Sequence, residues 1–194
     1  MVKWHMRDLT KWFYQNKPEE TQAAAALLLS IDANVLAKGG VALAGGYLRD
    51  LYFGNQPKDM DFVFYGLTVR EFLEAVRMWA CRTPGELSWE VFDGDYNGAD
   101  RIIPAVIKVS HEGREMDLIL YDCPALDGVM HNFDHSVNEF TMGYDADFRL
   151  WVKHWGEWGV CTRNANTTCT DERAARMQEL ARQIDWEYVD VEVQ

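Results

Sequence analysis

Apolar residues follow two rhythms along this chain, one typical of helices and the other typical of strands. In several stretches they recur three and four positions apart, which places them on one face of a helix. Pro or Thr opens some of these stretches and Gly follows their ends, as is usual for helix boundaries. The pattern predicts helices over residues 18–36, 47–53, 68–81 and 171–184.

Short runs of β-branched and aromatic residues separate these helices and favour strands. Residues 41–44 stop at the pair Gly45-Gly46, which indicates a strand, a tight turn and then a helix. Further strands are predicted over 59–65, 87–92, 105–109 and 115–121, with a hairpin over 142–151. This order of elements predicts an α+β fold, a mixed β-sheet flanked by helices with a short C-terminal helical extension.

Length and composition favour one domain over residues 1–194, with its core at about 41–150 and the C-terminal helix at about 171–184. The longest wholly apolar run, residues 23–29, is far shorter than the ~20 residues that cross a bilayer. The first residues also lack the apolar segment of a signal peptide. We therefore expect a cytoplasmic protein without a membrane-spanning helix.

The charge balance bears on the choice of partner. Asp and Glu total 31 against 19 Lys and Arg, which gives a net charge of −12. Nucleic-acid binding draws much of its affinity from cationic side chains that neutralise phosphates. The balance therefore disfavours a large nucleic-acid footprint, whereas a small anionic substrate carried by Mg²⁺ fits the composition.

Three carboxylates form the first candidate site. Asp59 and Asp61 are separated by one residue in a predicted strand, so both project to the same side. Asp117 lies in the predicted strand over 115–121, which can sit beside the first strand in the sheet. Carboxylates on neighbouring strands suit two Mg²⁺ ions that activate a hydroxyl and hold a triphosphate. A surface Asp pair without a ligand is the alternative.

The glycine pair forms the second candidate site. Gly45 and Gly46 stand at a strand end that leads into a predicted helix. Glycines let the backbone approach a ligand closely, and a helix N-terminus presents N–H groups and a positive dipole end to phosphate oxygens. The turn is therefore a candidate phosphate cradle. Without the acid pair downstream, an ordinary glycine turn would be the simpler interpretation.

Together these residues form the string Gly45-Gly46-Tyr47-Leu48-Arg49-Asp50, then Gly54, then Lys58-Asp59-Met60-Asp61. The string resembles the GGxxRD…G…KDxD signature of nucleotidyltransferases of the polymerase β-like superfamily. It is similar in particular to the head domain of CCA-adding enzymes and bacterial poly(A) polymerases. The resemblance covers about residues 41–182. There is no room for the family's tRNA-holding domains, so the chain looks more like the small stand-alone nucleotidyltransferases of bacteriophages.

The resemblance implies roles for individual residues. Asp59 and Asp61 would hold two metal ions, Asp117 would be the third metal carboxylate, and Arg49 would counter the charge of the triphosphate. Residues 134–138 resemble the end of the family's nucleotide-sugar motif RRDFTIN, which implies that Asp134 and Asn138 contact the ribose. If this stretch is helical, the two lie at positions i and i+4 and share a face.

The chain departs from that motif at one place, because Asn132-Phe133 stands where the family has two arginines that help to hold the nucleotide. Nearer the C-terminus, residues 171–176 resemble the start of the family's neck helix. That likeness implies that Glu172, Arg173 and Arg176 read the base. A solvated helix face is the alternative.

Other chemistry-bearing residues fit no further site. His131 and His135 have the spacing of a metal pair on a helix, but no third ligand is evident, so we expect structural roles. Trp151, Trp155 and Trp158 are spaced like a helix face and indicate core packing or a partner surface rather than base stacking. The cysteines form no CxxC pair and are expected to be free thiols: Cys81, Cys123, Cys161 and Cys169.

The sequence thus predicts a template-independent nucleotidyltransferase of the EC 2.7.7 type. It would transfer a nucleoside monophosphate from an NTP, ATP or CTP, to a hydroxyl, using two Mg²⁺ ions or Mn²⁺ in their place. The acceptor is left open between a tRNA 3′ end, a protein and a small molecule. The alternative is a nucleotide- or partner-binding protein that kept the fold without efficient transfer, which the missing arginine pair favours.

Overall fold

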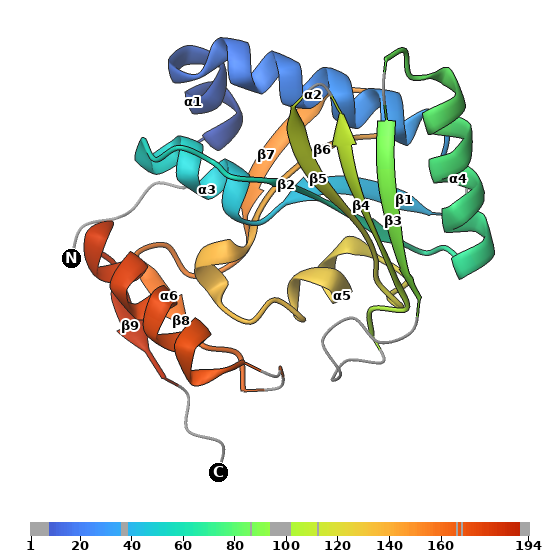
Figure 1. Ribbon diagram of the computed structural model, residues 1–194. Helices are drawn as coiled ribbons and strands as arrows, with labels where there is room; N and C mark the ends of the chain where they lie inside the picture. Colours follow the sequence, from blue (N-terminus) through green and yellow to red (C-terminus); the bar gives the residue numbers. More distant parts are fainter. Residues whose placement is uncertain are drawn as a thin grey trace.

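A seven-stranded mixed sheet forms the centre of the structure, a computed structural model that describes residues 8–35, 39–85, 87–93, 102–111, 113–165, 167 and 169–190 (Figure 1). The strands lie in the order β3-β4-β5-β2-β1-β6-β7. Only β2 and β5 pair in parallel; the other neighbours are antiparallel. The strands are β1 (Gly40–Ala44), β2 (Met60–Tyr65), β3 (Leu87–Asp93), β4 (Ala105–His111), β5 (Arg114–Leu120), β6 (Phe140–Tyr144) and β7 (Leu150–His154).

Helices α1 to α4 cover one face of the sheet, and the short helix α5 covers part of the opposite face (Figure 1). The helices are α1 (Leu9–Asn16), α2 (Pro18–Asp32), α3 (Gly46–Phe53), α4 (Val69–Arg82), α5 (Leu126–Met130) and α6 (Asp171–Gln183), with the 3-10 turn η1 at Ser136–Asn138. α1 to α4 contribute Phe13, Leu28, Leu48 and Phe72 to the main core. Val129 of α5 belongs to a smaller core on the opposite face.

Strand alternation decides which residues face which core. In β2, Phe62 and Phe64 belong to the main core, whereas Val63 belongs to the smaller core on the α5 side. Asp61 has the parity of Val63, so its carboxylate lies on the α5 side as well. The acids therefore stand on the face that the long helices leave uncovered.

The C-terminal residues add a small unit beside this sheet, at the lower left of Figure 1. Strands β8 (Val160–Thr162) and β9 (Glu187–Val189) pair in parallel, and α6 connects them. The Ser136 hydroxyl of η1 donates to the Val160 carbonyl at 3.0 Å and accepts from the Thr162 N–H at 2.8 Å. These bonds join the unit to the segment that carries Asn138.

Most predicted elements are confirmed, including the α+β class, the mixed sheet and the helices at 47–53, 68–81 and 171–184. The helix expected over 18–36 ends earlier, at Asp32, because Asn34 and Val35 turn back onto carbonyls three residues before them. Its expected last residue lies outside the described residues. The sequence patterns did not reveal α1, α5, β8 or β9. No helix in the described ranges has the length and apolar character to cross a bilayer.

Two sequence interpretations were wrong in detail. Asp134 and Asn138 do not lie on one helix, since only Ser136–Asn138 is helical and His135 has extended backbone angles, φ −143° and ψ 138°. The helix-like spacing of the tryptophans also misled, because Trp151 is in β7 and Trp158 follows it in a turn. Core packing is nevertheless confirmed for Trp158, which contacts a ring cluster that includes Tyr52, Phe140 and Trp186.

Glu139, between η1 and β6, provides a test of the fold that does not depend on function. Burial raises the pKa of Glu139 to about 7, and the charge of His131 opposes this shift. His154 is a further titratable group on this side of Glu139. Both side chains approach Gly156, where an added Cβ would lie 3.3 Å from Glu139 Oε2 and 3.2 Å from His154 Cε1. In the wild type, the free energy of unfolding therefore falls as pH rises from about 4.5 to about 7, because only the unfolded state ionises there.

Glu139→Gln removes the fall of the unfolding free energy with rising pH, because the Gln side chain does not ionise. We expect the variant to gain about 1–2 kcal/mol of unfolding free energy at pH 8, after allowance for solvent screening, and clearly less at pH 5.5. Urea unfolding at the two pH values measures the difference. An equal effect at both pH values would show that the Glu139 carboxyl ionises normally in the folded protein.

Candidate active site

Asp61 and Asp117 lie opposite each other on adjacent parallel strands. The register of β2 and β5 pairs Asp61 with Asp117, and β1 places Ala44 on the other side of Asp61. Paired residues in a sheet point to the same face, so the two carboxylates project together. Asp59, two residues before Asp61, completes the group. The structure thus brings together the three acids that the sequence singled out.

Asp61 lies within electrostatic reach of both other acids. Burial, together with the negative charges of Asp59 and Asp117, raises the pKa of Asp61 to about 7 against the opposing charges of Arg173 and Arg49. Burial also raises the pKa of Asp117, which Lys108 opposes with its Nζ 3.7 Å from Asp117 Oδ2. Like charges held together in this way are unfavourable without a cation. The group therefore has the electrostatics of a cation site.

The glycine pair is built directly against these acids. Gly45 has φ +82°, and a Cβ there would lie 2.9 Å from Asp61 Oδ2. Both the backbone conformation and the space thus require glycine. The Gly45 N–H donates to the Phe140 carbonyl at 3.0 Å, so Gly45 supplies space beside the acid rather than a free donor. Gly46 begins α3 and opens its N-terminus toward the same cavity.

Arg49 is held in place by two neighbours. Its Nε donates to Asp50 Oδ1 at 2.8 Å, its Nη2 lies 2.7 Å from the same oxygen, and its Nη1 donates to Asn138 Oδ1. The Asn138 side chain in turn donates to Asp134 Oδ1 at 3.2 Å. Asp134 and Asn138 therefore meet, as the motif suggested, but through a bend of the chain. Arg49 thus forms an ion pair with the residue next to it in the chain.

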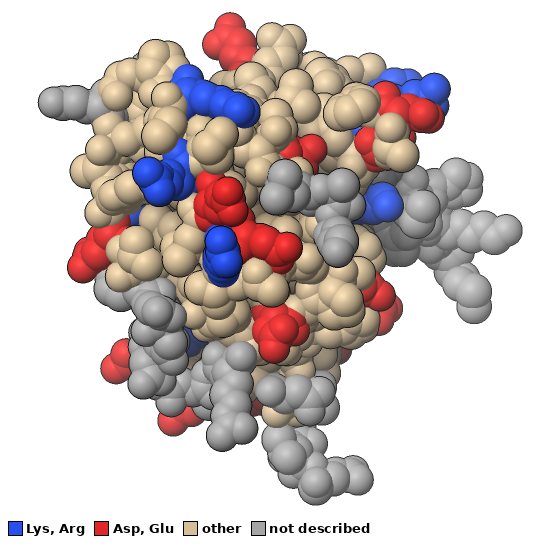
Figure 2. All heavy atoms as spheres, turned by 90° about the vertical axis from the view of Figure 1, so that its right-hand side faces the viewer, with Lys and Arg blue, Asp and Glu red and all other residues tan. Residues whose placement is uncertain are grey.

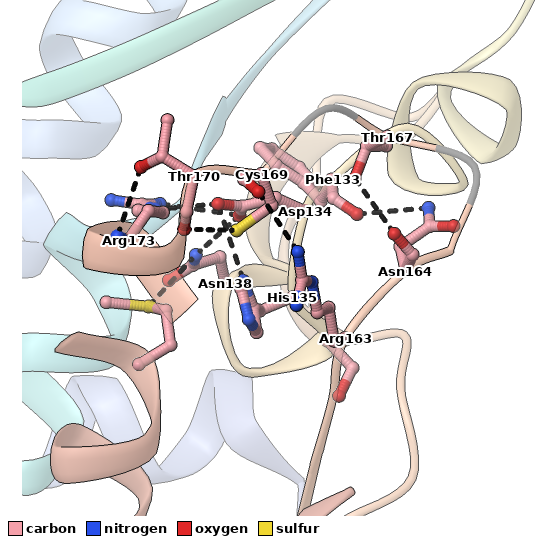
Figure 3. A network of polar contacts seen from close by, with 12 residues as sticks. Phe133, Asp134, His135, Asn138, Arg163, Asn164, Thr167, Cys169, Thr170 and Arg173 are labelled. Atoms are coloured by element: carbon pink, nitrogen blue, oxygen red, sulfur yellow. Dashed lines mark hydrogen bonds and ion pairs between the residues drawn. The ribbon is translucent and has the colours of Figure 1, made fainter. Parts of the chain in front are cut away.

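Asp134 anchors α6 (Figure 3). Arg173 Nε donates to Asp134 Oδ2 at 2.6 Å, and His135 Nδ1 lies 3.4 Å from the same oxygen. Burial alone would raise the pKa of Asp134, but the contacts with His135 and Arg173 outweigh it and lower the pKa below its usual range. The Asp134 carboxylate is thus charged and fully engaged. A connected series of polar contacts runs from Asp50 through Arg49, Asn138 and Asp134 to Arg173.

A cavity of about 540 Å³ lies between the acids and α6. Eight residues that the sequence named line it: Gly45, Gly46, Arg49, Asp59, Asp61, Asn138, Arg173 and Arg176. Three others do not: Asp117, Asp134 and Glu172. Asp117 joins the site through its strand partner Asp61, and Asp134 through Arg173. Glu172 is exposed on α6 and the structure does not bring it into the cavity.

Sequence reasoning assigned no role to several residues that line this cavity. Phe133 occupies the position where the resembled family has an arginine, and Asn55 and Lys58 come from the loop before β2. On α6, the lining continues through Met177, Glu179, Leu180 and Gln183. Extending the helical spacing from Arg173 and Arg176 would have found these α6 residues.

The histidines do not form the metal pair that their spacing allowed. His131 is exposed and its Nδ1 lies 2.7 Å from the Asp127 carbonyl. His135 is buried, and its ring lies instead in a group with Asp134 and Cys169, whose ligand-type atoms are within 4.8 Å of one another. The ion pair of Asp134 with Arg173 already provides this group with a positive charge, so we assign it a structural role.

The three acids have the ligand chemistry of a hard divalent cation, although their carboxylate oxygens do not all lie within 4.8 Å of one another in this structure. They offer only carboxylate oxygens, which are the ligands that Mg²⁺ and Mn²⁺ prefer. Burial and the neighbouring negative charges raise the pKa of Asp61. A bound cation would offset both effects and favour the ionised carboxylate. Asp59, Asp61 and Asp117 are therefore the residues suited to hold such an ion.

No protein-family model matches the chain, and no curated protein is similar to it at a significant level. Solved structures do match. A CCA-adding enzyme in complex with CTP has a TM-score of 0.65 at 17% identity, over 95% of this chain and 43% of that one. A CCA-adding enzyme with ATP has a TM-score of 0.61 at 19% identity, over 95% and 44%.

The Thermotoga maritima CCA-adding enzyme complexed with tRNA has a TM-score of 0.53 at 16% identity, over 92% of this chain and 46% of that one. The chain thus spans less than half the length of the structures that it matches. At such identities the likeness concerns the fold, not the activity. The chain has the nucleotidyltransferase fold of these CCA-adding enzymes, as its sequence motifs suggested.

Proposed function

We propose that the protein transfers a nucleoside monophosphate from an NTP to a hydroxyl acceptor and releases pyrophosphate, as a nucleotidyltransferase of the EC 2.7.7 type. The observation that carries this proposal is the register of β2 and β5, which aligns Asp61 with Asp117. Beside them, Gly45 packs against the Asp61 carboxylate and α3 opens toward the cavity. An acid group and a phosphate-binding turn thus share one site.

In this proposal Asp59 and Asp61 would hold the metal ions, and Asp117 would contribute a further carboxylate ligand. When bound there, Mg²⁺ supplies a Lewis acid that neutralises phosphate charge and makes a hydroxyl more acidic. The chain itself supplies position. Gly46 and the first turn of α3 receive the β- and γ-phosphates, because helix N-terminal N–H groups and the helix dipole favour anions there.

Arg49 contributes a fixed positive charge. Because Asp50 and Asn138 hold its guanidinium, and its side chain is 12% exposed, its orientation is set before a nucleotide binds. A donor that needs no reorganisation stabilises developing charge more effectively than a mobile one. Catalysis would then depend mostly on positioning and electrostatics.

The nucleoside would lie against α6. Phe133, Met177 and Leu180 give the cavity an apolar wall suited to a base. Arg173 is committed to Asp134, and Glu172 lies away from the cavity, which leaves Arg176, Glu179 and Gln183 as the polar groups for the base edge. The predicted contact of Asp134 with the ribose becomes an indirect one, through Asn138. ATP and CTP are the candidates, since CCA-adding enzymes of this fold are seen with each.

A second candidate function is nucleotide binding without efficient transfer. Phe133 in the cavity wall favours it, because an apolar ring replaces a cationic group of the resembled motif. Against it stand the three clustered acids, whose mutual repulsion has no evident use in a binding protein.

Turnover separates the two functions. The protein is incubated with each α-labelled NTP, Mg²⁺ or Mn²⁺, and a cell extract that supplies acceptors, and the labelled product is identified. We expect label to enter an acceptor with ATP or CTP, in a metal-dependent reaction that releases pyrophosphate. Tight binding of Mg-NTP without any labelled product would favour the binding protein. The extract covers a tRNA 3′ end, a protein and a small molecule as acceptors.

A further inference from the structure

A second cavity, of about 490 Å³, adjoins the first one at the catalytic acids. The two cavities share Lys58 and Asp59. The second cavity extends from there between the N-terminal end of α2, the start of α3 and the turn between β4 and β5. The glycine pair, Arg49 and α6 line the first cavity, which the nucleotide would occupy, and none of them lines the second. It therefore approaches the acids from a different side than the nucleotide does.

Carboxylates dominate the walls of this second cavity. Glu19 and Glu20 come from the first turn of α2, and Glu115 comes from β5 two residues before Asp117. With Asp59 they make four acidic groups, against the two basic groups of Lys58 and Arg114. In the ion pairs of the described residues, none of Glu19, Glu20 and Glu115 takes part. These carboxylates thus line the cavity without an ion pair, and acidic groups outnumber the basic ones there.

The walls also face one another. Burial raises the pKa of Tyr47, Arg114 lowers it and Glu20 raises it, so α2, α3 and β5 present these groups to a common space. In β5, Glu115 has the same parity as Asp117, so its carboxylate points to the side on which Asp117 lies. A molecule in this cavity would therefore reach the acids at Asp59 while it contacts Glu20 and Glu115.

From this geometry we propose that the second cavity binds the acceptor, and that the acceptor is a small molecule bearing a hydroxyl and an ammonium group. The inference rests on the proposed nucleotidyl transfer. The acceptor oxygen forms a bond to the α-phosphorus and the bond from that phosphorus to the bridging oxygen breaks. Pyrophosphate leaves with the electron pair of that bond, and the hydroxyl proton passes to water. Glu20 and Glu115 bind the ammonium group and leave the hydroxyl at Asp59, the acid that lines both cavities.

The charge of the cavity argues against an RNA end as the acceptor. A tRNA 3′ end carries a phosphate on each nucleotide, and these phosphates would meet Glu19, Glu20 and Glu115. On a different face of the molecule, the one seen in Figure 2, the described Lys and Arg side chains are interspersed with acidic and uncharged ones. The net charge of −12 acts in the same direction.

The test compares acceptors of different charge, including one pair that differs in charge alone. Choline and its uncharged isostere 3,3-dimethyl-1-butanol are supplied with labelled NTP and Mg²⁺, alongside glycerol 3-phosphate and tRNA lacking its 3′-terminal nucleotides. We expect kcat/KM for choline to exceed that for the isostere by about tenfold, with no label in the two anionic acceptors. Glu20→Gln and Glu115→Gln should each raise KM for choline about three- to fivefold and leave kcat and the KM for the isostere unchanged. Glu74→Gln, on the exposed side of α4, is the matched control.

Binding measurements separate failure of this inference from failure of the proposed function. Calorimetry with a non-hydrolysable Mg-NTP analogue tests the nucleotide site, and saturation-transfer NMR with choline tests the second cavity. Equal use of choline and its isostere, preferential labelling of tRNA, or absence of both choline binding and choline labelling would overturn the inference. If the analogue does not bind and no acceptor is labelled, the proposed function fails. Choline binding that Glu20→Gln and Glu115→Gln weaken would then still support the cavity as a cation site.

Discussion

Replacement of Asp61 by Asn is expected to reduce nucleotidyl transfer by about three orders of magnitude or more. Asp61 is the carboxylate that the other acids surround, and the amide of Asn cannot supply the charge that holds a metal ion against a triphosphate. Loss of one preorganised charge at a developing anion alone costs about 10²- to 10³-fold. Initial rates of pyrophosphate release with labelled NTP measure the effect.

The fold should survive this substitution. Burial among like charges makes the ionised form of Asp61 unfavourable, so a neutral, isosteric side chain relieves repulsion rather than creating it. Circular dichroism and thermal unfolding check this point. Asp147→Asn, in the exposed turn before β7, is the matched control and should leave transfer unchanged. Wild-type turnover by Asp61→Asn would remove Asp61 from the catalytic site.

Asp117→Asn should reduce transfer by about a hundredfold or more while Mg-NTP binding is retained. Asp117 lies on β5, across from Asp61, and does not line the cavity assigned to the nucleotide. The triphosphate would depend on Asp59, Asp61 and the first turn of α3, whereas Asp117 would act on the acceptor side. Single-turnover rates and calorimetric titration of the Mg-NTP analogue measure the two effects separately.

Lys108 provides the control for this prediction. The Lys108 ammonium lies 3.7 Å from Asp117 Oδ2, and Asp117→Asn removes the negative charge of this ion pair. Thermal unfolding of Asp117→Asn therefore has to show that the variant is folded. Lys108→Met, in which Asp117 loses its neighbouring cation, should keep a larger share of activity. If Asp117→Asn is folded and fails to bind Mg-NTP, the division of roles between Asp117 and Asp61 is wrong.

The sequence predicted the placement of these residues well where that placement depends on local spacing. Asp59 and Asp61 are two residues apart next to an extended segment, and Gly45-Gly46 stands between a strand and a helix, so backbone periodicity alone places them. The pairing of Asp61 with Asp117 is longer in range, yet both lie in recognisable strands that the motif resemblance relates. The register of β2 and β5 confirms this pairing, which arises from regular strands without a bulge at either residue.

Prediction was poorer where a residue's environment comes from distant segments. The bend at His135, which brings Asn138 to Asp134, has no local helical or strand pattern and depends on the bridge to Arg163. Spacing likewise suggested a helix for tryptophans that lie on β7 and in the turn after it. In both cases pairing with another part of the chain overrides the local preference.

By itself the sequence determined the α+β class, the three acids, the glycine turn and the α6 helix, because periodicity and turn chemistry act over a few residues. Only the tertiary structure decided what α6 does. Its Arg173 is neutralised by Asp134, which lies 39 residues earlier, and its next turns form a wall of the cavity. It also decided that a second, acidic cavity meets the first at Asp59. Cavities and ion pairs of this kind arise from segments that fold together, and no spacing along the chain encodes them.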